Sequence, residues 1–104
     1  MNPVFHPEFK ASYNAAVSWY GGISPHLAER FSGEIKAGVA RVARGQVADA
    51  FGPHGFRCYR CKKFPYLVYY EIHGESVLFL AVLYAGRATN ALRGQLAAYK
   101  NKGV

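Results

Sequence analysis

Two stretches with helical periodicity, followed by stretches with strand periodicity, constrain this fold more than any other feature. Apolar residues recur at helical spacing over residues 7–20 and again over residues 25–44. The pair Gly21-Gly22 predicts the end of the first helix, and Ser24-Pro25 is a typical start for the second. Because the connection is so short, we expect an antiparallel helical hairpin whose apolar face must be buried.

Three strands are predicted after a loop over residues 46–55. They cover residues 56–61, 64–73 and 76–84 and are rich in the aromatic and β-branched residues that strands favour. A tight turn at Gly74-Glu75 joins the last two. Both of these strands are apolar on their two faces, which is typical of central strands.

The ends of the chain supply the remaining predicted elements. Residues 4–6 predict a short first strand, and Thr89 begins a final helix that ends near Tyr99. The predicted order is therefore β-α-α-β-β-β-α, an α+β fold with the helical hairpin packed on one face of an antiparallel sheet. A chain of 104 residues of which 51% are hydrophobic fits one domain, residues 1–104.

The charge is positive and unevenly distributed. Thirteen Lys and Arg against six Asp and Glu give a net charge of +7 and a sequence pI of about 9.7. No acid follows Glu75, and Asp49 is the only acid between Lys36 and Tyr70. Clustered positive charge favours polyanionic or acidic partners, because it speeds their association and releases counterions. A solubilising surface is the alternative interpretation.

Nothing in the sequence indicates export or membrane insertion. There is no apolar leader after a basic start. The longest apolar run, residues 77–85, is too short to cross a bilayer. We therefore expect a cytoplasmic protein with no membrane partner.

Cys58 and Cys61 form a CxxC pair with competing interpretations. Redox-active pairs place the first cysteine at a helix N-terminus, where the dipole lowers its pKa, whereas this pair lies on a predicted strand. Residues three apart on a strand point to opposite faces, and a zinc site would require His54 and His73 as further ligands. Two free thiols in a reducing cytosol, with no metal or other cofactor, is the favoured interpretation.

Five short segments follow one another in a characteristic order along nearly the whole chain. They are Val4-Phe5-His6-Pro7-Glu8-Phe9, Trp19-Tyr20, Ala28-Glu29-Arg30-Phe31, the strand from Phe64-Pro65-Tyr66 to Ile72, and Ala81-Val82-Leu83-Tyr84 running to Arg87. Their order and spacing resemble the RelE/ParE toxins of bacterial type II toxin–antitoxin systems, also called plasmid stabilisation proteins. The resemblance implies a growth-inhibiting toxin that is neutralised by a small antitoxin encoded beside it.

The resemblance leaves two targets open. RelE-like members cut mRNA on the ribosome, with a basic site nearly free of carboxylates on the sheet face opposite the helices. ParE-like members poison DNA gyrase and are not nucleases. A shared fold cannot choose between these targets, so the site residues must. A non-toxic basic module that binds nucleic acid is a third hypothesis, and a homodimer is also left open.

The resemblance also implies roles for individual residues. Arg87 matches the arginine that contacts phosphate, and Arg57 lies where a basic catalytic residue is expected. RNA cleavage needs a base, an acid and positive charge on the transition state, so these two arginines are the candidate catalytic residues. The candidates for binding the target or nucleic acid are Arg60, Lys62, Lys63, Tyr66 and Arg93.

Three tyrosines depart from the nuclease pattern. Tyr66 stands where an active RelE-like nuclease tends to carry an arginine, and Tyr59 where a second lysine is expected. Tyr84 stands where many relatives have a histidine. A tyrosine with a pKa near 10 can orient a substrate or stack on a base, but it replaces a cation poorly. These departures favour gyrase, or an undetermined target, over mRNA.

Overall fold

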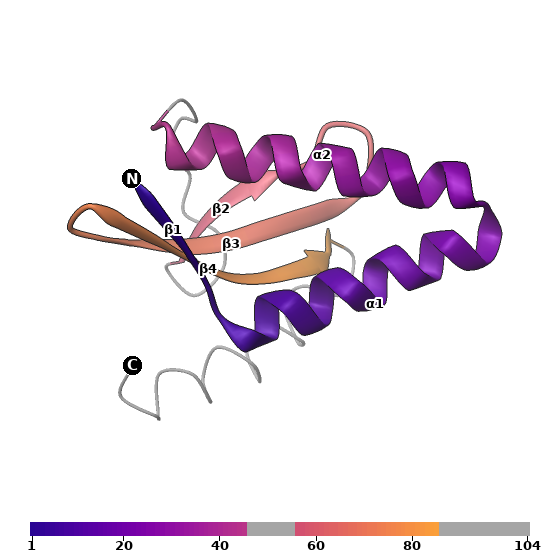
Figure 1. The fold of residues 1–104 in the computed structure, drawn as a ribbon, viewed down its shortest axis with the longest axis horizontal. Coiled ribbons are helices and arrows are strands. Elements are labelled where there is room, and N and C mark those ends of the chain that lie inside the picture. Colours follow the sequence, from indigo (N-terminus) through magenta and orange to yellow (C-terminus); the bar gives the residue numbers. More distant parts are fainter. Residues whose placement is uncertain (46–55, 86–104) are drawn as a thin grey trace.

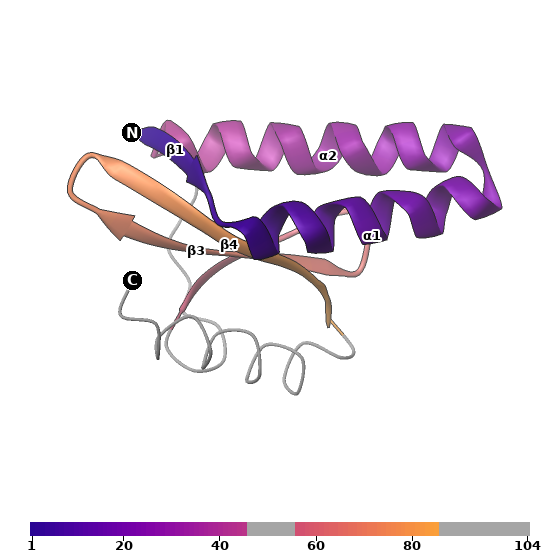
Figure 2. The same cartoon turned by 60° about the horizontal axis from the view of Figure 1, so that its bottom comes forward.

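The computed structural model describes residues 1–45 and 56–85 as a layer of two helices on a four-stranded sheet (Figures 1 and 2). The elements in chain order are β1 (Asn2–Phe5), α1 (Pro7–Ile23), α2 (Pro25–Ala43), β2 (Arg57–Arg60), β3 (Tyr66–His73) and β4 (Ser76–Tyr84). Their order, with the helical hairpin over one face of the sheet, confirms the predicted α+β fold. The predicted loop over residues 46–55 and the predicted helix over residues 89–99 lie outside the described residues.

Helix α1 is longer than predicted, because it continues through Gly21-Gly22 to Ile23. Its end is set by Ser24, whose backbone is extended and whose N–H donates to the Tyr20 carbonyl at 2.9 Å. The Ser24 hydroxyl oxygen also accepts from the N–H of His26 at 3.2 Å, as an N-cap of α2. Each helical glycine costs roughly 1 kcal/mol relative to alanine. Packing of α1 against α2 and β4 offsets that cost.

The sheet has the order β1-β4-β3-β2, so β3 and β4 are the central strands, as their apolar faces predict. Strands β2, β3 and β4 form an antiparallel meander. Strand β1 pairs with β4 in parallel, from Asn2 opposite Ser76 to Phe5 opposite Phe79. The prediction of a wholly antiparallel sheet is therefore wrong at β1, and the sheet is mixed. Strand β1 is only four residues long and leads directly into α1, so the packing of α1 on β4 sets its direction.

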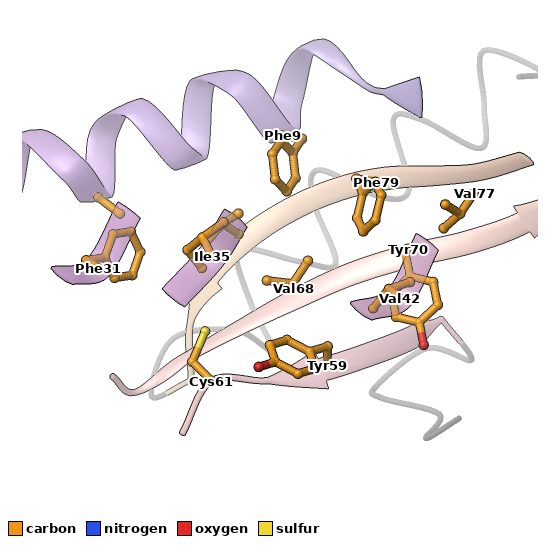
Figure 3. Close-up of a cluster of buried hydrophobic side chains, with 12 residues drawn as sticks. Phe9, Phe31, Ile35, Val42, Tyr59, Cys61, Val68, Tyr70, Val77 and Phe79 are labelled. Atoms are coloured by element: carbon orange, nitrogen blue, oxygen red, sulfur yellow. The ribbon is translucent and has the colours of Figure 1, made fainter. Parts of the chain in front are cut away.

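Buried side chains form one cluster on each face of the sheet. The cluster between sheet and helices, which we call the helix-side cluster, is shown in Figure 3 and contains Phe9, Ala16, Phe31, Ile35, Val42, Tyr59, Cys61, Val68, Tyr70, Val77, Phe79 and Val82. The opposite-face cluster contains Phe56, Tyr69, Leu80, Ala81 and Leu83, with Cys58, Leu67 and Leu78 packed against it. A bulge in β4 makes Leu80 the extra residue, since Tyr69 pairs with Ala81 and Tyr70 with Phe79.

Ser12 of α1 supplies a hydrogen-bond acceptor to β4 beyond the end of β1. The register of β1 on β4 stops at Phe79. Farther along β4, the N–H of Val82 donates to the Ser12 hydroxyl oxygen at 2.9 Å. The same hydroxyl donates to the carbonyl of Glu8 at 2.8 Å. Ser12 therefore satisfies a main-chain donor of β4 that no residue of β1 reaches.

Replacing Ser12 with alanine should lower the free energy of unfolding by roughly 1–2 kcal/mol, because the Val82 N–H loses its acceptor in a buried position. Urea denaturation at equilibrium measures this change. Ser18→Ala is the matched control, since Ser18 is exposed on the same helix, and it should shift stability by less than about 0.5 kcal/mol. Equal losses in the two variants would contradict the role given to Ser12.

Candidate functional site

The two arginines of β2 lie on opposite faces of the sheet. Arg57 is paired with Tyr70, which belongs to the helix-side cluster. Arg60 is paired with Leu67, which packs on the opposite-face cluster. Directly opposed residues on neighbouring strands share a face. A site on the face opposite the helices, as the RelE-like pattern requires, would therefore include Arg60 but not Arg57.

Three exposed cations gather at the connection between β2 and β3. Arg60 ends β2, and Lys62 and Lys63 follow it, so we call these three residues the basic turn. The N–H of Lys63 donates to both carboxylate oxygens of Glu34, at 3.0 and 3.4 Å. Because Glu34 belongs to α2, the helix holds the backbone of the turn in place. The carboxylate engages the main chain, and the side chains of Lys62 and Lys63 are exposed.

An aromatic cluster lies directly beside the basic turn. It consists of Tyr20, Phe31, Phe64, Tyr66 and Tyr84. The ring of Tyr66 lies 5.0 Å from that of Phe31 and 5.7 Å from that of Tyr84 between centroids. Phe31 is fully buried and Tyr84 is 45% exposed, so the cluster extends from the core to the surface. Burial raises the pKa of Tyr20, and the nearby hydroxyls of Tyr66 and Tyr84 raise it further.

Tyr59 is a packing residue rather than an accessible site residue. It is buried beneath α2, where a guanidinium N–H of Arg41 donates to its hydroxyl. The Arg41 guanidinium carbon also lies 5.3 Å from the centroid of the Tyr59 ring. Burial raises the pKa of Tyr59, and the positive charge of Arg41 partly opposes the rise.

Gly38 allows this contact between α2 and β2. A Cβ atom built at Gly38 would lie 2.5 Å from Cε1 and 3.0 Å from Cζ of Tyr59. The helix can therefore approach the tyrosine ring only with a glycine at this position. Glu34, Gly38 and Arg41 lie on successive turns of α2 and all contact β2 or the turn after it. None of the three was a candidate from the sequence, although a glycine inside a predicted helix is a signal of close packing.

The two cysteines do not converge, as strand alternation predicts. Cys61 is buried in the helix-side cluster, and Cys58 is half-buried against the opposite-face cluster. Burial raises the pKa of Cys61 to about 12, and the Glu34 carboxylate adds to the effect. Burial also raises the pKa of Cys58, although Arg60 opposes it. Both thiols therefore stay protonated at neutral pH, which makes them poor nucleophiles.

The described part of the chain contains most of the residues that the sequence singles out. Arg87, Arg93 and His54 lie outside it. Tyr66, Tyr69 and Tyr70 are buried or half-buried in the sheet, as predicted. Over residues 1–45 and 56–85, no three side chains of the His, Cys, Asp or Glu types are placed to hold a metal. Neither helix in these ranges is long and apolar enough to cross a membrane.

Comparison with known proteins identifies the family. Residues 4–89 match the model of the ParE toxin of the type II toxin–antitoxin system parDE. A solved structure, a chain of the chromosomal ParDE TA system from P. aeruginosa, is similar with a TM-score of 0.68 at 19% sequence identity. The similarity covers 79% of this chain and 92% of that one, and at this identity it shows a shared fold. No curated protein matches. The chain belongs to the family of ParE toxins of type II toxin–antitoxin systems.

Proposed function

We propose that this ParE toxin arrests growth by acting on DNA gyrase. The observation that carries the proposal is the burial of Tyr59, at the position where a RelE-like nuclease is expected to carry a lysine. Its hydroxyl is bound to Arg41 beneath α2, so it has no access to a substrate. Together with the placement of Arg57 and Arg60 on opposite faces, this supports a toxin that does not cleave RNA.

The nuclease alternative would depend on Arg57 and Arg87. Positive charge near the transferred phosphate stabilises the transition state of RNA cleavage, and tyrosines at positions 59 and 66 do not supply it. Tyr66 is packed between Phe31 and Tyr84 in the aromatic cluster. Its phenol can orient or stack on a partner, but this role requires no cleavage.

We further propose that a ParD-like antitoxin neutralises the toxin at the basic turn and the aromatic cluster. The turn offers exposed cations for acidic side chains, and the half-exposed rings beside it offer places for apolar anchors. An antitoxin segment that is disordered alone and folds on binding can cover both features. Three of the thirteen Lys and Arg residues lie within four positions of each other in the basic turn, which has no acidic residue.

Controlled expression of the chain in bacteria tests the target. We expect growth arrest with altered DNA supercoiling and intact mRNA.

Arg57→Ala should leave the arrest nearly unchanged, whereas it would weaken a nuclease strongly. Arg87→Ala should abolish the arrest with either target, so it tests the site and not the target, and it should change the unfolding free energy by less than about 1 kcal/mol. Degraded mRNA with unaltered supercoiling, and rescue by Arg57→Ala, would establish the nuclease instead. Normal growth with soluble protein present would contradict both targets.

A further inference from the structure

Helix α1 carries an exposed apolar strip along one flank. The strip consists of Ala11, Ala15, Trp19 and Ile23, which are four residues apart and therefore lie in one row along the helix. All four are exposed, Trp19 at 67% and Ile23 at 62%. Contiguous large apolar side chains are unusual on the surface of a monomeric protein and mark contact surfaces.

The strip faces away from the other described elements. Phe9 and Ala16 are buried and mark the face of α1 that packs on the sheet. The hydroxyl of Tyr13 lies 2.6 Å from the Ser32 hydroxyl of α2, so Tyr13 marks the flank that meets α2. At about 100° per residue, Ala15 points roughly opposite to Tyr13. The strip therefore lies on the flank of α1 turned away from α2, at the rim of the two-layer arrangement seen in Figure 2.

Side-chain size changes in one direction along the strip. Ala11 and Ala15 are at the N-terminal end, and Trp19 and Ile23 are at the C-terminal end. When two such strips pack antiparallel about a two-fold axis, the large side chains of each copy meet the small ones of the other. A surface of this kind is self-complementary, which is the requirement of an isologous interface.

The charges near the strip favour a second copy over an acidic partner. The four side chains carry no charge. The exposed, acidic Glu8 is three residues before Ala11 and lies on the same side of the helix, whereas Lys10 lies on a different flank with Asn14 and Ser18. An acidic antitoxin segment would find exposed cations at the basic turn but none among the four strip residues. We therefore propose that the strip is the contact between two copies of this chain. In this arrangement the α1 helices are antiparallel, and Trp19 and Ile23 of each copy pack over the alanines of the other.

The size of the strip and the charge of the chain set the strength of the dimer. Stable interfaces use about 20–30 residues a side, and four side chains with their neighbours provide far fewer. Each copy also carries +7, which opposes association. The dimer should thus be weak and reversible, and added salt should strengthen it by screening this repulsion. Binding of an acidic partner at the basic turn should respond to salt in the opposite direction.

Sedimentation of the antitoxin-free chain over a range of concentrations tests the proposal. We compare Ala15→Glu with Asn14→Glu, which adds the same charge one residue away on the polar flank. The first variant should raise the dimer dissociation constant at least tenfold, and the second by less than about twofold. Circular dichroism should show both variants folded, because both positions are exposed. For the wild type, the dimer fraction should rise between low and moderate salt.

Three results would overturn the proposal. The wild type could remain monomeric at every concentration and salt level. The two glutamate variants could associate equally well, which would place the contact elsewhere. Association could weaken with salt, which would point to a charge-driven contact through the basic turn. A monomeric wild type whose antitoxin binding is weakened by Ala15→Glu but not by Asn14→Glu would assign the strip to the antitoxin instead. The test does not depend on the toxin's target.

Discussion

Reversing both lysines of the basic turn, in the variant Lys62→Glu/Lys63→Glu, should slow antitoxin association by about 10- to 100-fold at low salt. Both side chains are exposed on a turn whose backbone is held by Glu34, so they present fixed positive charge without a structural role in the core. Charged residues at the rim of an interface act mainly by attracting the partner before contact. This long-range attraction raises association rates by about 10- to 1000-fold. Stopped-flow mixing with a ParD antitoxin measures the rate.

The dissociation rate should change much less, because in the proposed complex apolar anchors on the aromatic cluster hold the bound segment. The control is Lys10→Glu/Lys36→Glu, with the same charge change at exposed lysines of α1 and α2 that are not part of the turn. It should slow association by only a few-fold, and moderate salt should remove most of the difference between the two variants. If both double variants slow association equally, net charge rather than the basic turn steers the encounter. A wild-type rate indifferent to salt would remove the turn from the neutralised surface.

Gly38→Ala should destabilise the protein by about 2 kcal/mol, although alanine is the better helix former. The added methyl would lie 2.5 Å from the Tyr59 ring. That ring cannot move aside cheaply, because it is buried beneath α2 and bound to Arg41 through its hydroxyl. Overpacking of this kind typically costs about 1–3 kcal/mol, and here it also disturbs the hydrogen bond. Urea denaturation gives the change directly.

Gly33→Ala is the control within the same helix. Gly33 is exposed, and a Cβ there meets no atom within 4 Å. This variant should be more stable than the wild type by about 0.5–1 kcal/mol, through helix propensity alone. The two alanine variants therefore shift stability in opposite directions. Stabilisation by Gly38→Ala would mean that α2 does not approach β2 as closely as the Gly38–Tyr59 geometry requires.

Local patterns predict much of this fold. The periodicity of the helices, the Ser24 cap and the two apolar faces of β3 and β4 each depend on neighbours in the sequence, and each prediction is confirmed. Two features depend on packing instead. Gly21-Gly22 does not end α1, since tertiary contacts offset the cost of the glycines. The direction of β1 follows from where α1 lies on β4, which no four-residue pattern encodes.

The candidate site was less predictable, because its residues come from separate elements. Alternation along β2 could have separated Arg57 from Arg60, since residues three apart on a strand face opposite sides. The burial of Tyr59 could not be read from the sequence, as it requires Gly38 and Arg41 of α2 above it. The contact of Glu34 with the Lys63 amide joins residues that only the tertiary fold brings together. The binding of a partner by Arg60, Lys62 and Lys63 of the basic turn stays a prediction.

The parallel pairing of β1 with β4 determines when the domain can be completed during synthesis. Residues 2–5 pair with residues 76–79. Strand β1 therefore has no partner strand until all the intervening residues have been synthesised. The contacts between α1 and α2 are local and can form early, but the apolar face of the hairpin has no sheet to pack on until β3 and β4 have been made. Contacts so distant in sequence form late. A nascent chain on the ribosome is therefore expected to be non-toxic until β4 has emerged, which gives an antitoxin time to reach it.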